Sequence, residues 1–185
     1  MSQRFSTDIL IIGGGAAGLA TALQLADHAR VTVLCKGDLT TGSSHWAQGG
    51  VAAVTDPADQ FSDHARDTID AGAGLCDEKI VNMVVENAPE VINQLLRWGV
   101  DFDRENNEFH LTREGGHSQR RVLHVADATG RAITEKLTAQ VLDHPNIELI
   151  NDRLVIDLVN LSKLGRYPSR CAGAYALNRT TGAHL

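Results

Sequence analysis

The chain has 185 residues, of which 43% are hydrophobic and 22% are charged. This length is enough for one domain with a buried core, and the composition is that of an ordinary globular protein. The formal net charge is −6 and the sequence contains no basic cluster, which argues against a nucleic-acid partner.

The three cysteines, Cys35, Cys76 and Cys171, are far apart and form no C-x-x-C pair. This pattern indicates neither a disulfide framework nor a zinc site. We therefore expect a cytoplasmic protein in which all three cysteines are small buried side chains.

The first predicted elements are a strand at residues 8–12, a glycine turn, and a helix at residues 16–25. The turn glycines have the G-x-G-x-x-G spacing of a dinucleotide-binding turn. Gly13 permits a sharp turn, Gly15 lets the backbone approach a pyrophosphate, and Gly18 lets the helix pack closely on the sheet. The phosphates are expected at the helix N-terminus, where unpaired N–H groups favour negative charge.

A second strand, predicted at residues 31–34, completes a βαβ unit. An acidic residue that would hold a ribose is expected at Cys35 or Lys36, and neither is acidic. Lys36 weakens an NAD-binding interpretation and leaves FAD or NADP open. Residues 9–26 carry no charge and are about long enough to cross a bilayer, but four glycines make a poor membrane helix, so no membrane partner is expected.

The next segment, residues 39–54, is predicted to be a loop rich in Gly, Ser and Thr. Such a loop suits phosphates or a flavin ring, and Gly49 and Gly50 would allow close approach to a flat ligand. We expect Trp46 and the apolar end of the loop to be buried.

Residues 57–99 are predicted to be helical. Within the first helix, His64 is expected at the surface. The second helix is expected to begin after Asp77 and to be kinked or split at Pro89. Its predicted apolar face consists of Ile80, Val84, Ala88, Val91, Leu95 and Trp98.

The segment 100–125 is predicted to loop and to carry charges and three histidines, at positions 110, 117 and 124. A polar cluster that lines an anionic substrate site explains it better than a metal site, since no recognised ligand spacing is present. A helix over residues 127–142 is predicted next, with Ile133, Leu137 and Val141 inward. Strands at 147–150, 154–159 and 172–177 and a hairpin turn at 178–182 complete the chain.

Four segments together carry a resemblance: GGGAAG from Gly13, SSHWAQGG over residues 43–50, TREGGHS from Thr112 and HVADATG from His124. In this order they resemble the succinate dehydrogenase and fumarate reductase flavoprotein family. The resemblance implies an α/β fold: a Rossmann-like FAD-binding domain with a parallel sheet, a helical insertion and a β-hairpin. It also implies that residues 1–185 are an incomplete N-terminal FAD-binding domain, inactive alone, truncated before the capping and C-terminal domains that supply the catalytic base.

Two positions select a branch of that family. Members that bind FAD covalently often carry a histidine five residues before the glutamine of AQGG; Ser43 stands there, so a noncovalent FAD is expected. Glu114 stands where succinate-oxidising members have an apolar residue. A carboxylate there can hold an ammonium group through a charge-assisted hydrogen bond, which favours L-aspartate over succinate as the substrate. The alternative role of Glu114 is a structural ion pair with Arg113, Arg120 or Arg121.

The resemblance then implies hydride transfer from L-aspartate to the flavin, giving iminoaspartate for NAD biosynthesis. Oxygen or fumarate would reoxidise the flavin, and quinolinate synthase is a possible functional link. Arg120 and Arg121 would help to hold the loop, with no catalytic role. The residues expected at the cofactor are Gly13, Gly14, Gly15, Ala16, Ala17, Gly18, Lys36, Ser43, Ser44, His45, Trp46, Ala47, Gln48, Gly49, Gly50, Leu154 and Val155. Two alternatives stay open: a fumarate reductase or succinate dehydrogenase type of flavoprotein, and a noncatalytic nucleotide-binding module.

Overall fold

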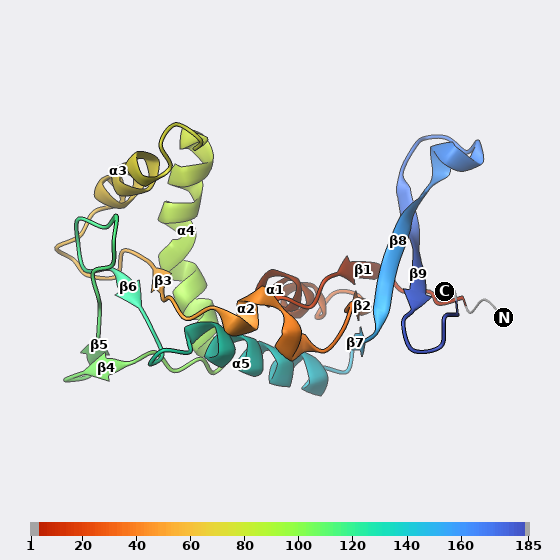
Figure 1. Cartoon of the computed structure of the whole chain (residues 1–185), viewed down its shortest axis with the longest axis horizontal. Coiled ribbons are helices and arrows are strands. Elements are labelled where there is room, and N and C mark those ends of the chain that lie inside the picture. Colours follow the sequence, from red (N-terminus) through yellow and green to blue (C-terminus); the bar gives the residue numbers. More distant parts are fainter. Residues whose placement is uncertain (1–3, 184–185) are drawn as a thin grey trace. The chain divides into compact units, whose positions relative to one another are not determined.

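The computed structural model describes residues 4–183, and the chain divides into two compact units (Figure 1). Unit 1 contains the described residues up to Trp46 and from Leu137 onward, and unit 2 contains residues 47–136. The fold class is α/β, as the sequence predicts.

Unit 1 is built on a parallel sheet of β1 (Ile9–Ile12), β2 (Val31–Leu34) and β7 (Ile147–Ile150), in the order β1-β2-β7. Helix α1 (Ala16–Leu25) connects the first two strands, which confirms the predicted βαβ unit. All four residues of β2 are buried, as expected for the central strand of a parallel sheet. The uncharged stretch at 9–26 is therefore a strand, a turn and a short helix. In the part of the chain that the structure describes, no helix is long and apolar enough to cross a membrane.

Unit 1 also contains a β-hairpin, formed by β8 (Arg153–Asn160) and β9 (Cys171–Asn178), with the 3-10 helix η2 (Leu161–Leu164) between them. This pair confirms the two strands predicted near the end of the chain. After β2 the sequence predicts a loop, but the structure has a 3-10 helix, η1 (Leu39–Thr41), and a single helical turn, α2 (Ser43–Trp46).

Unit 2 contains two helices, α3 (Phe61–Ala71) and α4 (Glu78–Arg97), which pack together through Ala65, Val81 and Val85. The unit also contains two short antiparallel strand pairs: β3 (Val51–Ala52) with β6 (Val122–Leu123), and β4 (Arg104–Glu105) with β5 (Glu108–Phe109). Helix α5 (Thr129–Asp143) begins in this unit, and its predicted inward residues are all buried.

Helix α4 continues through Pro89, so of the two predicted effects of this proline the split does not occur. Its buried face differs from the prediction and consists of Val81, Val85, Ile92 and Leu95. Of the predicted face only Leu95 is buried, whereas Val91 remains 51% exposed. The sequence contains two apolar stripes one position apart, at 80, 84 and 91 and at 81, 85 and 92, and both have helical spacing. Only packing against α3 decides between them.

Three side chains lie in environments that the sequence does not predict. His64 is buried rather than at the surface, with 6% of its area exposed. Of the cysteines, Cys35 is buried, Cys76 is half-buried and Cys171 is exposed. The expectation of three buried cysteines is therefore correct only for Cys35, because the hairpin strand β9 leaves Cys171 open to solvent.

The face of α4 can be tested by two truncations at adjacent positions. Ile92 is 1% exposed and Val91 is 51% exposed. We expect Ile92→Ala to lower the free energy of unfolding by about 2–5 kcal/mol, because it opens a cavity in the core, and Val91→Ala to change it by no more than about 0.5 kcal/mol. Urea denaturation measures both values, and a larger loss for Val91→Ala would restore the face predicted from the sequence.

Candidate functional site

The glycine turn of unit 1 has a conformation that side chains would prevent. Gly13 has φ +115°, in the region that favours glycine. A Cβ atom on Gly18 would lie 1.9 Å from the carbonyl oxygen of Gly13, and one on Gly14 would lie 2.3 Å from the Sγ atom of Cys35. Gly13 and Gly18 therefore have the backbone roles that the spacing predicts, whereas Gly14 is required by its packing against the residue after β2.

The N-terminus of α1 is open to an anion. Gly15, its N-cap residue, provides no side-chain cap, and the first N–H groups of a helix have no acceptor within the helix. One of them, that of Ala16, donates to the hydroxyl oxygen of Ser44 on α2 at 3.3 Å. Two predicted binding segments, the glycine turn and Ser43–Trp46, thus meet in unit 1. Unpaired N–H groups, a helix dipole and a hydroxyl fit the pyrophosphate of a dinucleotide.

The ends of β2 and β7 carry cationic side chains. Lys36 follows β2, and its carbonyl oxygen accepts a hydrogen bond of 2.8 Å from Nη1 of Arg179. The N–H of Arg153 donates to the carbonyl of Cys35 at 2.9 Å, and the Nε atom of Arg153 is buried without a partner among residues 4–183. Sequence patterns single out only Lys36, since Arg153 and Arg179 reach this edge through the β8–β9 hairpin.

The other residues predicted at the cofactor have varied environments. Leu154 and Val155 pair with Leu177 and Ala176 in the hairpin, with Leu154 37% exposed. Trp46 is 67% exposed, so the expectation that it is buried is wrong for this chain. His45 contacts the Trp46 ring edge to face, with 5.7 Å between centroids.

Residues Ala47 to Gly50 belong to unit 2. The carbonyl of Ala47 accepts a hydrogen bond from the N–H of Gly130 at 3.0 Å. A Cβ atom on Gly50 would lie 2.2 Å from the carbonyl oxygen of Leu123, whereas one on Gly49 would meet nothing within 4 Å. Gly50 is therefore needed for the approach of this segment to β6, and only Gly49 has free space that a flat ligand could use.

Glu114 lies in an exposed turn of unit 2. Its carbonyl oxygen accepts a hydrogen bond from the N–H of His117 at 3.2 Å, and Gly116, the third residue of this turn, has φ +86°. Just before the turn, Thr112 forms a β-bridge with Val122. The predicted alternative, an ion pair of Glu114 with a nearby arginine, is not formed by any of the three candidates within residues 4–183.

Arg121 forms a buried ionic network at the end of the same loop. Its side chain is 0% exposed, and Nε and Nη2 donate to the two carboxylate oxygens of Asp59 at 2.7 and 2.8 Å. Nη1 donates to Asp67 and also lies 3.2 Å from Nδ1 of His117. Asp67 further accepts bonds of 2.7 Å from the N–H and the hydroxyl of Ser118.

The network determines the charges of its members. The Arg121 guanidinium holds the pKa of Asp59 below its usual value. Burial alone would raise the pKa of Asp67, but hydrogen bonds from Ser118 and Arg121 lower it to about 2. Burial also lowers the pKa of His64, and the Arg121 charge lowers it further, so its neutral form is favoured. Both carboxylates are therefore ionised at neutral pH.

The three histidines spaced by seven do not converge. His110 stacks on His124, with 3.3 Å between Nδ1 of the first and Nε2 of the second. His117 instead lies beside His64 and Arg121. Among residues 4–183, no group of three or more His, Cys, Asp or Glu side chains is arranged to hold a metal ion.

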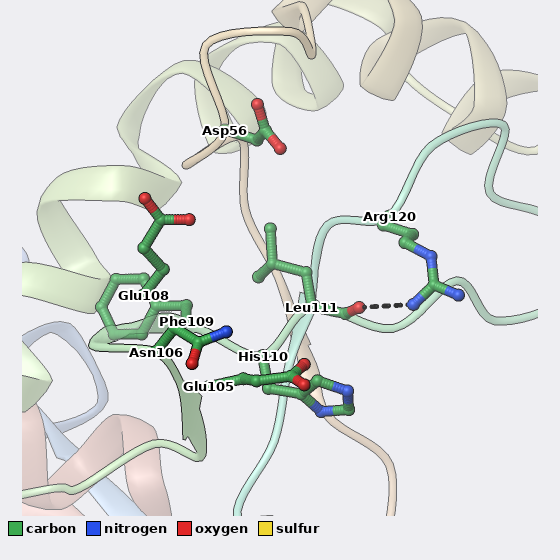
Figure 2. A pocket seen from close by; sticks show the side chains of 8 residues that line it. All are labelled: Asp56, Glu105, Asn106, Glu108, Phe109, His110, Leu111 and Arg120. Carbon is green, nitrogen blue, oxygen red and sulfur yellow. Dashed lines mark hydrogen bonds between the residues drawn. The ribbon is translucent and has the colours of Figure 1, made fainter.

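A cavity of about 290 Å³ opens elsewhere in unit 2 (Figure 2). Its wall includes the carboxylates of Asp56, Glu105 and Glu108, together with Arg120, whose Nη1 donates to the carbonyl of Leu111 at 3.2 Å. Neither Glu114 nor any residue predicted at the cofactor lines it, whereas His110 and Arg120 come from the segment that was predicted to line an anionic substrate site. Three carboxylates disfavour an anionic ligand, so this cavity is not a candidate site for a dicarboxylate.

Comparison with known proteins gives a consistent result. Residues 8–185 match the family described as FAD binding domain. The chain is 51% identical to an L-aspartate oxidase of Pseudomonas aeruginosa, over 98% of this chain and 35% of that protein. It is 46% identical to an L-aspartate oxidase of Vibrio cholerae, over 93% of this chain and 33% of that protein.

Solved structures of flavoproteins are also similar. The E. coli quinol fumarate reductase FrdA matches with a TM-score of 0.85 and 30% identity, over 95% of this chain and 30% of that one. The Sdh1 complex of Mycobacterium smegmatis matches with a TM-score of 0.88 and 25% identity, over 98% and 32%.

These matches show that the chain belongs to the FAD binding domain family, and its cofactor is FAD. It spans about a third of the length of the curated relatives that it matches.

Substitutions of Gly18 and Gly49, two glycines of the predicted cofactor site, are expected to differ in their effect on stability. A methyl group on Gly18 would clash with the backbone of Gly13, whereas one on Gly49 meets nothing within 4 Å. We expect Gly18→Ala to lower the free energy of unfolding of the FAD-free protein by about 1–3 kcal/mol, and Gly49→Ala to leave it nearly unchanged. Equal values in urea denaturation would contradict the packing role of Gly18.

Proposed function

We propose that this chain is the FAD-binding part of an L-aspartate oxidase, which oxidises L-aspartate to iminoaspartate. The relatives cited above carry that name. The observation that carries the proposal is the placement of Glu114, an exposed carboxylate in an ordered turn that no arginine of its own loop neutralises. Such a group can accept a charge-assisted hydrogen bond from the ammonium group that distinguishes aspartate from succinate.

The chain's own residues would act by binding and orientation. The Gly13–Gly18 turn and the Ser44 hydroxyl would hold the pyrophosphate of FAD, and Lys36 would contact the adenosine side. Residues 43–50 would surround the phosphates and the flavin, and the backbone at Leu154 and Val155 would pass the adenine. The flavin, when bound, supplies the two-electron redox chemistry.

The rest of the reaction depends on groups outside this chain. We propose that residues 1–185 are the N-terminal part of a larger FAD-binding domain, with the helical segment 57–99 within it. The capping domain and the C-terminal domain would supply the catalytic base and the remaining contacts to FAD. Oxygen or fumarate would accept the electrons. The product would enter NAD biosynthesis in the cytoplasm, with quinolinate synthase as a possible functional link.

A second candidate is a flavoprotein of the fumarate reductase or succinate dehydrogenase type, which the similarity to the E. coli quinol fumarate reductase favours. Ser43 and Glu114 argue against this candidate. Ser43 stands where members with covalently bound FAD often have the linking histidine, and the carboxylate of Glu114 has no ammonium group to bind on succinate. A noncatalytic nucleotide-binding module, the third alternative, predicts no turnover of either substrate by the complete protein.

The role of Glu114 is tested in the complete enzyme by Glu114→Gln, which keeps the shape and removes the charge. We expect kcat/KM for L-aspartate to fall roughly 10- to 100-fold, the worth of a hydrogen bond to a charged group, while fumarate reduction changes little. Steady-state kinetics with each substrate measures the ratio. Equal losses for aspartate and fumarate would rule out the binding of the amine by Glu114.

The attachment of FAD is tested by the visible absorption spectrum of the complete enzyme before and after denaturation. With Ser43 at the position of the linking histidine, we expect the flavin bands to leave the protein when it is denatured and filtered. Bands that remain with the denatured chain would show a covalent flavin and support the succinate dehydrogenase type.

A further inference from the structure

We propose that Asp67 is a positioning residue for substrate selection: through Ser118 and Arg121 it fixes the loop that presents Glu114 to the substrate amine. This inference rests on the proposed function and extends it to α3, a helix that carries none of the residues predicted at the cofactor or substrate.

The Glu114 turn is held at both ends. On the N-terminal side, Thr112 is bridged to Val122, with backbone hydrogen bonds of 3.0 and 3.1 Å. On the C-terminal side, the N–H and the hydroxyl of Ser118 both bind Oδ2 of Asp67 at 2.7 Å. Residues 113–117 connect Thr112 to Ser118. Within them, the hydrogen bond from the N–H of His117 to the carbonyl oxygen of Glu114 forms a turn. Asp67 is therefore the C-terminal anchor of this turn.

The anchor is rigid because Asp67 is itself fixed by Arg121. The guanidinium is fully buried and is bound on its other side by both oxygens of Asp59, which sets its orientation. A bidentate arginine–carboxylate pair has one preferred geometry. The remaining nitrogen, Nη1, then points at Asp67. The position of Asp67 is thus determined by two elements, its own helix and the buried arginine.

Loss of this anchor would release the turn that carries Glu114. Residues 113–116 and Ser118 are exposed, so once the bonds to Asp67 are gone this side of the turn is held mainly by the contacts of His117 with His64 and Arg121. A charge-assisted hydrogen bond to a substrate depends on position, and a displacement of about 1 Å can reduce the rate strongly. A purely structural role predicts something different, an equal loss for aspartate and fumarate.

The test uses Asp67→Asn in the complete enzyme, since asparagine keeps the shape but its uncharged amide oxygen binds the three donors of Ser118 and Arg121 more weakly than the carboxylate does. The matched control is Asp63→Asn on the same helix, where the half-buried carboxylate pairs with Arg66. We expect Asp67→Asn to lower the ratio of kcat/KM for aspartate over that for fumarate reduction by roughly tenfold. The control should leave this ratio unchanged.

The double variant Asp67→Asn/Glu114→Gln shows whether Asp67 acts through Glu114. If it does, adding Asp67→Asn to Glu114→Gln causes no further fall in the ratio. Additive falls, or an equal loss for both substrates in Asp67→Asn alone, overturn the proposal. If Asp67→Asn does not fold, Ser118→Ala removes one of the two anchoring hydrogen bonds and is judged by the same ratio.

Hydrogen exchange of residues 113–118 gives a readout that is independent of turnover. We expect their amides to exchange faster in Asp67→Asn than in the wild type or in Asp63→Asn, because the acceptor of the Ser118 N–H is then uncharged and weaker. Unchanged exchange overturns the anchoring role. If Glu114→Gln leaves the substrate ratio unchanged, the amine-binding role in the proposed function is wrong, and the exchange result still decides whether Asp67 holds the loop.

Discussion

The guanidinium of Arg121 is completely buried between the carboxylates of Asp59 and Asp67, and much of unit 2 depends on this pairing. The backbone of the same residue joins two further segments: its carbonyl accepts from the N–H of Ala53, and its N–H donates to the carbonyl of Thr112. A buried charge that loses one partner destabilises a protein by about 3–5 kcal/mol. The start of α3, the loop before β6 and the end of β3 are therefore constrained together by one side chain and its backbone.

The sequence predicts unit 1 well because its signals are local. A strand, three spaced glycines and a helix specify one another within the stretch 8–26, where Gly13 has a positive φ and a Cβ atom on Gly18 would meet the backbone of Gly13. The parallel pairing of β1 with β2 follows from the short connection through α1. Of the cations near the ends of β2 and β7 the sequence singles out only Lys36, since Arg179 lies 143 positions from the Lys36 carbonyl that it binds.

Unit 2 is predicted less well, because its important contacts join distant positions. Asp59 and Arg121 are 62 positions apart, and among 17 basic and 23 acidic residues no local pattern pairs them. The burial of His64 has a similar cause, because helix α3 places it beside Arg121, which is distant in the sequence. The sequence alone predicted a surface position for it. The prediction of the buried face of α4 was wrong for another reason. Two apolar stripes of equal spacing are present in the sequence, and only packing determines which of them is buried.

The glycine motifs are required by the fold, whereas Glu114 is not. Gly14, Gly18 and Gly50 each stand where a Cβ atom would meet another part of this chain, so the fold requires them whatever substrate is used. A resemblance based on such positions indicates a shared fold and cofactor, which is consistent with similarity to both an aspartate oxidase and a fumarate reductase. Glu114 is exposed and no packing requires a carboxylate there. The fold therefore sets no requirement on the chemistry of this side chain, and a residue in such a position can be changed to suit a substrate without loss of the fold or of the cofactor site.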